Sequence, residues 1–494
     1  MNTDGDTGSA PHARAPLLRA LPWIIGVGLL AWKAALLRIM PLVYLDTPWS
    51  IGPAFSMMRG DLLGVDFATY HLTFNQYPWL YFALAAGWYS IVGTGILATH
   101  GFFFALIGLQ LVVIMHILRS RGADVTTSTL IVAAWMTTTY TYSFRFEGVG
   151  VTVLLLLVAR IHSRTQTGRY RDPLIAMLAA AAILTHPVPA VLSCAIVAWW
   201  LIAQRGGWGD LVFHASIILF ATGILYLPLV LLDVHRWLSI MLFDGLHHTE
   251  GMSAQFLLKY IARSPMIAVL LLIALTGTLR QRLWGELIPM LLLVLALSLI
   301  VRSNYFHYIP PILLAGSWLQ HPSRLPRLVA ACMIIASPII THYLPMFWIV
   351  EHPAYARTLR DVIRVTDSVG RDARPGRIYA TPQIVLELAD RPGSRLMYAE
   401  FPARAGHAPV LDSGDVILFH TPGAVRDLVA YFPTDQIGPI TTLVPPVKGL
   451  RTYPYDRSNR RSDSLGLWMV HVLHPPREDG RPRPSCGAHT VSPP

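Results

Sequence analysis

Residues 42–49, with the sequence LVYLDTPW, end the first long apolar stretch of the chain on an acidic side chain, Asp46. A carboxylate at the edge of a lipid bilayer is costly, and ionisable groups placed there commonly serve a function. The alternative is a helix cap, because Asp-Thr-Pro can begin the next helix with proline in its first turn. Taken alone, the segment leaves both interpretations of Asp46 open.

The composition around this segment indicates a polytopic membrane protein. The 494 residues are 53% hydrophobic and only 14% charged, with a mean hydropathy of +0.48, whereas soluble domains are about 25% charged. Many of the apolar stretches approach the roughly 20 residues that cross a bilayer. They lie near residues 17–41, 79–95, 98–118, 126–142, 148–162, 173–185, 187–203, 210–232, 264–279, 284–301, 304–319 and 328–348.

We therefore expect a polytopic α-helical membrane protein with about 11–12 transmembrane helices. The first stretch is too long for a signal-peptide core and lacks a small-residue cleavage site, so we expect it to be retained. The three cysteines do not have metal-ligand spacing. Walker, Gly-x-Ser-x-Gly, His-Glu-x-x-His and dinucleotide motifs are all absent from the sequence, which weakens the case for ATP-driven transport and soluble-cofactor chemistry.

The net charge of +11 is spread over short loops, mostly as arginine. The positive-inside bias of cytoplasmic loops explains this pattern, whereas nucleic-acid binding would need a continuous basic face. Arginines precede the first stretch and follow every second stretch from 98–118 onward, which predicts a cytoplasmic N-terminus. With the C-terminal region outside, the stretches cannot all cross. The expected exception is 79–95 or 98–118, one of which would be re-entrant or lie in the interface.

The predicted organisation places a helical membrane domain before a small extracytoplasmic domain. We expect residues 1–16 to be disordered, 17–348 to form the transmembrane catalytic domain with an outward loop at 42–78, 349–475 to form an α/β domain, and 476–494 to be a disordered tail. The expected strands of the α/β domain are 377–380, 396–398, 415–419 and 467–470, and its expected helices are 355–369, 383–390 and 423–431.

Polar and aromatic residues gather in the parts of the chain that this topology places outside. Residues 49–59 could form an amphipathic helix in the interface, followed by a loop rich in Asp, Tyr, His and Asn. An aromatic belt would explain Trp79 and Tyr81 but not the polar residues beside them. From this loop we select Arg59, His71 and Tyr77 as candidate substrate-binding residues.

Further candidates lie in the later outward turns. Arg145 and Glu147 could simply neutralise each other, or could bind a phosphate and a sugar hydroxyl or metal. His186 follows a helix and precedes two prolines, and it could form a structural hydrogen bond or contact a phosphate. Some of the remaining candidates could be ordinary loop residues. They are cations and hydroxyls at outward positions, namely Lys259, Arg302, Tyr305 and His307.

The order of these motifs resembles that of the C-type glycosyltransferases (GT-C fold), especially the group of protein O-mannosyltransferases and aminoarabinose transferases. Two departures from the family pattern are Thr47, where many members have a second acidic residue, and His186, where many have lysine. The segments that carry the resemblance are Asp46, FSMMRGD (55–61), NQYPWLY (75–81), RFE (145–147), LTHP (184–187), NYFHYIP (304–310) and LADRP (388–392).

The resemblance implies transfer of a sugar from a polyprenyl-phosphate donor to a lipid, glycan or protein acceptor at the outer face of the cell inner (plasma) membrane. Asp46 would be the catalytic base or would orient the acceptor, and Glu147 would position the acceptor or a metal. Arg302 and Arg145 would hold the lipid phosphate. Metal dependence varies in the family, so no cofactor is firmly predicted and a divalent metal stays open.

Two other functions remain open from the sequence. A secondary transporter or lipid flippase would have ionisable groups near mid-membrane and two symmetric halves, whereas here the polar groups lie at helix ends and we find no internal repeat. A non-catalytic membrane assembly protein would bind a partner through its outer domain, and Asp46 would then be replaceable.

Overall fold

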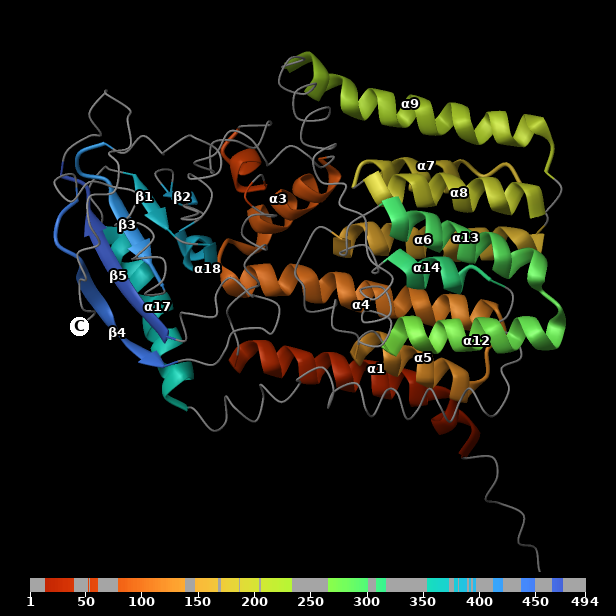
Figure 1. The fold of residues 1–494 in the computed structure, drawn as a ribbon, viewed down its shortest axis with the longest axis horizontal. Helices are drawn as coiled ribbons and strands as arrows, with labels where there is room; N and C mark the ends of the chain where they lie inside the picture. Colours follow the sequence, from red (N-terminus) through yellow and green to blue (C-terminus); the bar gives the residue numbers. More distant parts are fainter. Residues whose placement is uncertain are drawn as a thin grey trace, which may run out of the picture. The chain divides into compact units, whose positions relative to one another are not determined.

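The computed structural model divides the chain into two compact units, residues 1–356 and 357–494, which are described separately. Helices and strands keep the labels of Figure 1. The structure describes residues 14–39, 52, 54–60, 79–137, 147–167, 170–185, 187–203, 206–232, 265–300, 308–316, 353–372, 377–380, 382–388, 391, 394–396, 412–420, 437–448 and 464–473.

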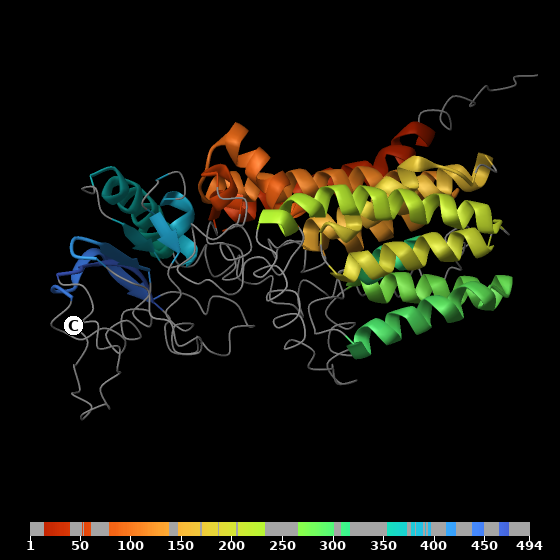
Figure 2. The same ribbon diagram turned by 90° about the horizontal axis from the view of Figure 1, so that it is seen from above.

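The first unit is a bundle of apolar helices (Figures 1 and 2). Among the described helices, three are long and apolar enough to cross a membrane, at 96–120, 148–165 and 208–227, and several shorter apolar helices accompany them. The helices of this unit are α1 (Arg14–Ile39), α3 (Leu80–Val92), α4 (Ile96–Ser120), α5 (Val125–Thr137), α6 (Glu147–Thr167), α7 (Pro173–Ile183), α8 (Pro187–Ala203), α9 (Trp208–Leu232), α12 (Pro265–Gln281), α13 (Trp284–Ile300) and α14 (Ile309–Leu314). Helix α1 thus begins three residues before the start expected from the sequence.

Helices α4 and α6 lie side by side in the middle of the bundle, and their facing side chains exclude solvent. Ile114 of α4 and Leu154 of α6 are completely buried. Helix α1 approaches α4 and α5 closely at Gly26, where an added Cβ would lie 2.8 Å from Leu111 Cδ1. By contrast, α9 leaves large apolar side chains exposed, with Phe220 71% accessible. Such a helix suits a lipid environment, because water would make this exposure costly.

Helices α3 and α4 differ in length in a way that bears on the topology. Helix α3 has 13 residues and α4 has 25, which correspond to about 20 and 37 Å at the helical rise. The tight connection uses Gly93 and Gly95, both at positive φ, and the Trp88 indole donates a 2.8 Å hydrogen bond to the Ala98 carbonyl. Helix α3 therefore folds back on the start of α4, and the lengths favour α4 as the crossing helix.

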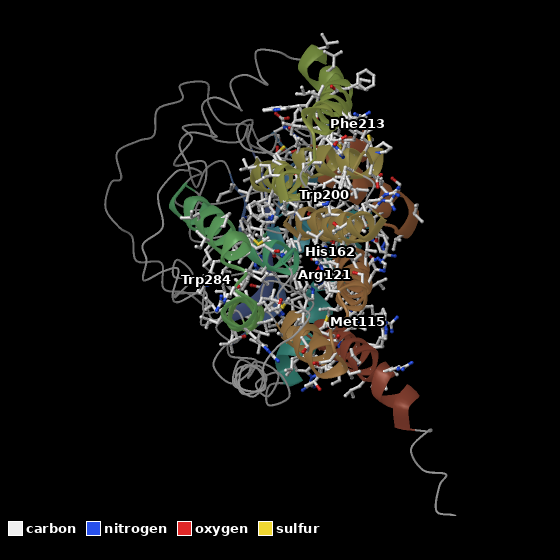
Figure 3. All side chains as sticks on the ribbon, turned by 90° about the vertical axis from the view of Figure 1, so that its right-hand side faces the viewer. Met115, Arg121, His162, Trp200, Phe213 and Trp284 are labelled. Carbon is white, nitrogen blue, oxygen red and sulfur yellow. The ribbon has the colours of Figure 1, made fainter. Side chains whose placement is uncertain are left out.

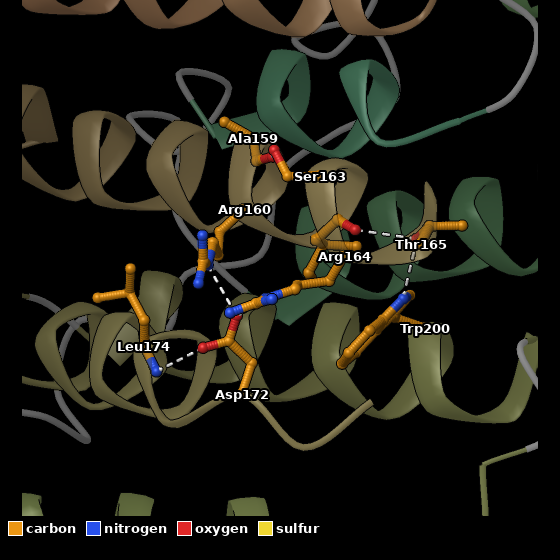
Figure 4. Close-up of polar contacts among 9 residues, drawn as sticks. Ala159, Arg160, Ser163, Arg164, Thr165, Asp172, Leu174 and Trp200 are labelled. Atoms are coloured by element: carbon orange, nitrogen blue, oxygen red, sulfur yellow. Dashed lines mark hydrogen bonds and ion pairs between the residues drawn. The ribbon is translucent and has the colours of Figure 1, made fainter. Parts of the chain in front are cut away.

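A cluster of charges joins α6 to α7 at the end of the bundle that carries the loop arginines (Figure 4). Asp172 is 2% exposed and accepts from Arg160 Nε at 2.7 Å, and it also pairs with Arg164. Its second oxygen accepts from the Leu174 amide at 3.0 Å and caps α7, which begins at a proline. The arginines that predict a cytoplasmic face therefore also hold two helices together.

The second unit is built on one sheet of five described strands in the order β2-β1-β3-β5-β4. Strand β1 pairs in parallel with β2 and β3, and β5 pairs antiparallel with β3 and β4. The elements are α17 (Pro353–Asp372), β1 (Ile378–Ala380), α18 (Pro382–Val385), the 3-10 helix η6 (Leu386–Leu388), β2 (Ser394–Leu396), β3 (Val416–Phe419), β4 (Thr441–Lys448) and β5 (Ser464–His471).

The sequence predicted the positions of β1, β3 and β5 but not that of β4. The predicted second strand overlaps β2 only at Leu396, and the predicted helix 423–431 lies outside the described residues. Strand β4 contains Pro445 and Pro446, which argue against a central strand because proline cannot donate to the ladder. The strand lies at the edge of the sheet, with register shifts on both sides of Val444, and there the prolines are tolerated.

His420, directly after β3, gives the second unit an expected sensitivity to acid. Burial lowers the pKa of this imidazole to about 3, against about 6.5 in the unfolded chain. Between these values the unfolded chain binds a proton that the folded unit does not, so stability falls as the pH drops below about 6.5. At pH 5 the loss is about 2 kcal/mol.

This loss is measured by hydrogen-exchange protection factors of β3 and β5 at pH 7.5 and pH 5. We expect His420→Gln to flatten the dependence, while His471→Gln, which changes an exposed histidine of β5, leaves it as in the wild type. Equal protection of the wild type at both pH values would contradict the prediction.

Candidate functional site

Most of the predicted site residues lie outside the part of the chain that the structure describes. Arg59 has a described side chain, and Glu147 is the first residue of α6, described by its backbone alone. The roles of all of them therefore stay predictions. The candidates outside the described residues are Asp46, His71, Tyr77, Arg145, His186, Lys259, Arg302, Tyr305 and His307.

Arg59 follows a short helical turn that packs on the protein itself. Residues 54–58 are helical, and the turn ends at Gly60, whose φ of 89° suits glycine. Phe55 is 1% exposed, with its ring centroid 4.8 Å from that of Tyr89 in α3. The apolar side of the predicted amphipathic helix is thus buried at Ala54 and Phe55, whereas Met58 is 38% exposed. This packing fixes the point where the polar loop begins.

Gly150 marks the place where the beginnings of three helices meet. A Cβ at Gly150 in α6 would lie 2.8 Å from Pro189 Cγ in α8, and 3.1 Å from both Cε1 and the hydroxyl oxygen of Tyr308 at the start of α14. Real Cβ atoms essentially never approach other atoms within 3.0 Å, so only glycine fits without movement. The beginnings of α6, α8 and α14 can therefore pack closely at this point because residue 150 has no side chain.

A buried glutamine fixes the first turn of α6 from the side of α4. Gln110 Nε2 donates to the Gly148 carbonyl at 3.1 Å and to Thr152 Oγ1 at 3.0 Å. The Thr152 hydroxyl in turn donates to the same carbonyl at 2.7 Å. A buried, hydrogen-bonded amide of this kind specifies one orientation of the turn, because leaving its partners unpaired would cost about 1–3 kcal/mol. Glu147, at the start of this turn, is thereby attached to a rigid support.

The start of α3 joins the same end of the bundle. The Leu80 amide donates to the Leu184 carbonyl at 3.0 Å, directly after α7. The Trp79 indole donates to the Leu225 carbonyl of α9 at 2.9 Å. The chain segments that lead to Tyr77 and to His186 therefore leave the described structure side by side.

Sequence distances connect these contacts to the predicted polar residues. Glu147 lies three residues before Gly150, His186 three before Pro189, and His307 one before Tyr308. These polar candidates therefore adjoin, in the sequence, the helix beginnings that meet at Gly150, while their side chains lie outside the described residues.

The other end of α14 is held by a half-buried arginine, Arg121, and a buried histidine, His162 (Figure 3). Arg121, which caps α4, donates from Nη2 to the Ala315 carbonyl at 3.0 Å and lies 2.6 Å from His162 Nδ1. His162 Nε2 lies 3.1 Å from the Leu314 carbonyl. The Arg121 Nε also donates to His162 Nε2 at 3.1 Å, so the guanidinium contacts both ring nitrogens of this histidine. Helix α14 is therefore fixed at both ends.

The sequence interpretation did not identify Gly150, Gln110 or the Arg121–His162 pair. The sequence did contain an indication of the Gly150 contact. Two glycines near the start of an apolar helix, Gly148 and Gly150, are unfavourable unless a neighbouring element approaches closely. Gln110 and His162 each appear as one polar residue within an apolar stretch, a pattern that indicates an interhelical hydrogen bond without naming its partner.

The Gly150 contact gives a prediction with a matched control in the same turn. Replacing Gly150 by alanine forces α6 away from Pro189 and Tyr308, and we expect catalytic rate to fall at least tenfold because a displacement near 1 Å at a reacting site is already costly. Gly148→Ala should retain near-normal activity, since its Cβ would meet Leu106 Cδ1 at an ordinary 3.7 Å. Equal activity of the two variants, measured as initial rates in the assay given under Proposed function, would contradict the role of this contact.

Within the described residues, no group of three or more His, Cys, Asp or Glu is placed to hold a metal ion. Glu147 and the other outward candidates are not covered by that statement, because their side chains are not described. Whether a metal ion binds near Glu147 is therefore left open, as it is by the sequence.

No family model matches the chain, and no curated protein sequence matches it. Solved structures do resemble it. ArnT from Cupriavidus metallidurans bound to undecaprenyl phosphate superposes with a TM-score of 0.60 at 12% identity, covering 93% of this chain and 98% of ArnT. ArnT in the apo state gives 0.56 at 13% identity, with 90% and 97% covered.

Arabinofuranosyltransferase AftD from Mycobacteria gives a TM-score of 0.49 at 13% identity, covering 92% of this chain and 40% of AftD. The fold is therefore that of ArnT over nearly its whole length, which confirms the GT-C fold predicted from the sequence. The number of membrane crossings is not settled by this likeness.

Proposed function

We propose that the chain is an integral-membrane glycosyltransferase that moves a sugar from a polyprenyl-phosphate donor to an acceptor on the extracytoplasmic side of the inner membrane. The observation that carries the proposal is the convergence of helix beginnings at Gly150, Pro189 and Tyr308, each adjoining a segment with polar candidate residues. The shared fold supports it, since ArnT has been crystallised with undecaprenyl phosphate, a polyprenyl phosphate.

The reaction is a displacement at the anomeric carbon. An oxygen of the acceptor, from a hydroxyl or a phosphate, forms the new bond to this carbon. The bond from the carbon to the donor phosphate oxygen breaks, and polyprenyl phosphate leaves with the electron pair. Attack from the face opposite the leaving group inverts the configuration. When the acceptor is a hydroxyl, its proton goes to a general base.

The chemistry of the outward residues assigns roles within this reaction. Asp46 takes the acceptor proton or orients the acceptor, and Glu147 at the start of α6 positions the acceptor or a metal. Arg302 and Arg145 hold the donor phosphate, because guanidinium matches phosphate geometry and offsets the charge that develops on the leaving group. The remaining candidates line the site as substrate-binding residues: Arg59, His71, Tyr77, His186, Lys259, Tyr305 and His307.

The second unit would stand outside the cytoplasm and help to select the acceptor. The unit contains a mixed parallel and antiparallel sheet and a helix, α17, with one buried face and one charged face. Such a polar unit following a membrane domain is suited to contacting a water-soluble part of an acceptor. The class of acceptor, whether lipid, glycan or protein, follows from the assay below.

The decisive experiment incubates the purified full-length protein in nanodiscs with a polyprenyl phosphate bearing a radiolabelled sugar, together with membrane lipid, glycan or protein fractions. The expected result is label in one acceptor fraction and an equal amount of free polyprenyl phosphate. The protein is also placed in sealed vesicles. Label that stays on the polyprenyl carrier and moves across the vesicle bilayer would show a flippase and would overturn the proposal.

A further inference from the structure

Helix α17 presents a row of arginines on its exposed side. Arg357, Arg360, Arg364 and Arg371 are spaced by three, four and seven residues, so they lie on one face of the helix. All four are exposed. This row of four arginines, called the basic strip below, runs along most of α17.

The opposite face of α17 is buried and holds the basic strip in place. Leu359 is 1% exposed and Val362 is completely buried. Gly370 approaches η6 so closely that an added Cβ would lie 2.6 Å from Leu388 Cδ2. Because the buried face packs on its own unit, the row of arginines stays on the exposed side of the helix.

The acidic residues of the helix leave the strip with a net positive charge. Asp361 pairs with Arg364 at 2.9 Å, and Asp367 pairs with Arg371 at 2.6 Å. Exposed pairs of this kind are weak, so the arginines can exchange these carboxylates for phosphates. Residues 353–372 carry four arginines against three aspartates, so the helix as a whole has a net charge of +1.

The position of α17 in the chain indicates which partner its basic strip can reach. Its first residue, Pro353, follows the apolar stretch predicted at 328–348 after only residues 349–352. A linker of this length spans at most about 18 Å. The attraction between a basic strip and anionic lipid acts within a Debye length of about 8–10 Å, a distance that the linker brings within reach.

We propose that the basic face of α17 lies along the anionic phospholipid headgroups of the membrane that holds the helical unit. The guanidinium groups bind lipid phosphates, in part bidentately. The helix axis then lies parallel to the bilayer surface, and the second unit is held down on the membrane rather than extending from it. This inference does not depend on glycosyl transfer.

Two orientations have to be distinguished, one with α17 parallel to the bilayer surface and one with the second unit extending away from it. They differ most at the C-terminal end of α17. Ser368 lies fifteen residues beyond Pro353 on the arginine side, or about 22 Å along the axis. A bimane label is attached to Ser368→Cys in the full-length protein, with the three native cysteines changed to alanine. The protein is placed in nanodiscs of phosphatidylcholine with or without phosphatidylglycerol, and quenching by headgroup nitroxide lipid is measured.

We expect strong quenching in the anionic nanodiscs, and little in the neutral ones or at high salt. Arg357→Gln with Arg360→Gln should lower the ratio of docked to undocked helix by roughly twentyfold, at about fivefold for each arginine near an anionic surface. The matched control, Arg280→Gln with Arg282→Gln, removes two exposed charges at the C-terminal end of α12 and should behave as the wild type.

Three results would overturn the inference. They are a label that is never quenched in anionic nanodiscs, quenching that is equal in neutral and anionic nanodiscs, and an arginine variant that is quenched like its control. Circular dichroism and gel filtration of the labelled proteins confirm that each variant compared is folded.

Discussion

Asp46→Asn is expected to reduce sugar transfer from the polyprenyl-phosphate donor by a factor of about 100 to 10,000, the range that a general base contributes. Asparagine has nearly the same shape and caps helices as well as aspartate does, but it cannot take a proton. The substitution therefore separates the two interpretations of this residue. A base loses its function in the variant, whereas a helix cap keeps it. Initial rates at saturating donor and acceptor measure the effect.

The control for this prediction is Asp210→Asn, in the first turn of α9. Asp210 pairs with Arg171 at 2.8 Å, and Arg171 is 64% exposed, so the pair contributes little and the variant should transfer sugar normally. Binding of the polyprenyl-phosphate donor used in the assay should be similar in the wild type and in Asp46→Asn, because the variant loses a proton acceptor rather than a phosphate contact. Transfer that persists unchanged in Asp46→Asn would remove Asp46 from the mechanism.

Asp172→Ala is expected to be the most destabilising single substitution among the described ion pairs, at about 3 kcal/mol. The carboxylate is 2% exposed and serves Arg160, Arg164 and the amide of Leu174. Its removal leaves two arginines facing each other and the first turn of α7 uncapped. The two arginines keep 31% and 24% of their side-chain surface accessible, so water offsets part of the loss, and the estimate is at the low end for a buried pair.

Two further substitutions divide this effect into its causes. Asp172→Asn keeps the helix cap and loses the charge, so it should cost about 2 kcal/mol, whereas Asp210→Ala removes a more exposed carboxylate and should cost clearly less. Thermal unfolding in detergent micelles, followed by tryptophan fluorescence, ranks the three variants. A midpoint for Asp172→Ala equal to that of Asp210→Ala would show that the cluster does not hold α6 and α7 together.

The sequence predicted the features that depend on apolar length and on loop charge. The helical class, the grouping of arginines at one end and strands β1, β3 and β5 all follow from local patterns. Hydropathy alone does not say which of the stretches 79–95 and 98–118 crosses the membrane. The length of α3 and the bond from Trp88 to the Ala98 carbonyl favour α4, and both depend on how the chain turns at two glycines.

The contacts that join distant parts of the chain could not be predicted. Gly150, Pro189 and Tyr308 are separated by dozens of residues, and nothing in the local sequence of any one of them names the other two. The same is true of Arg121 and the carbonyl of Ala315. Such pairings are set by the packing of whole helices, which one sequence constrains only through the general fit of its apolar faces. The polar residues that carry the proposed chemistry follow from the resemblance of short motifs, and their roles await the variants above.

The prolines of β4 have a consequence for the behaviour of the second unit in a crowded compartment. An exposed strand edge is a template on which another chain can add a strand, and long regular edges promote fibrillar association. Pro445 and Pro446 remove two amide donors from the eight-residue outer strand, and the register shifts around Val444 bend it away from ideal geometry. At the other border, the described part of β2 spans only three residues. Both features make it less favourable for a neighbouring copy to add a strand at the described edges of the sheet.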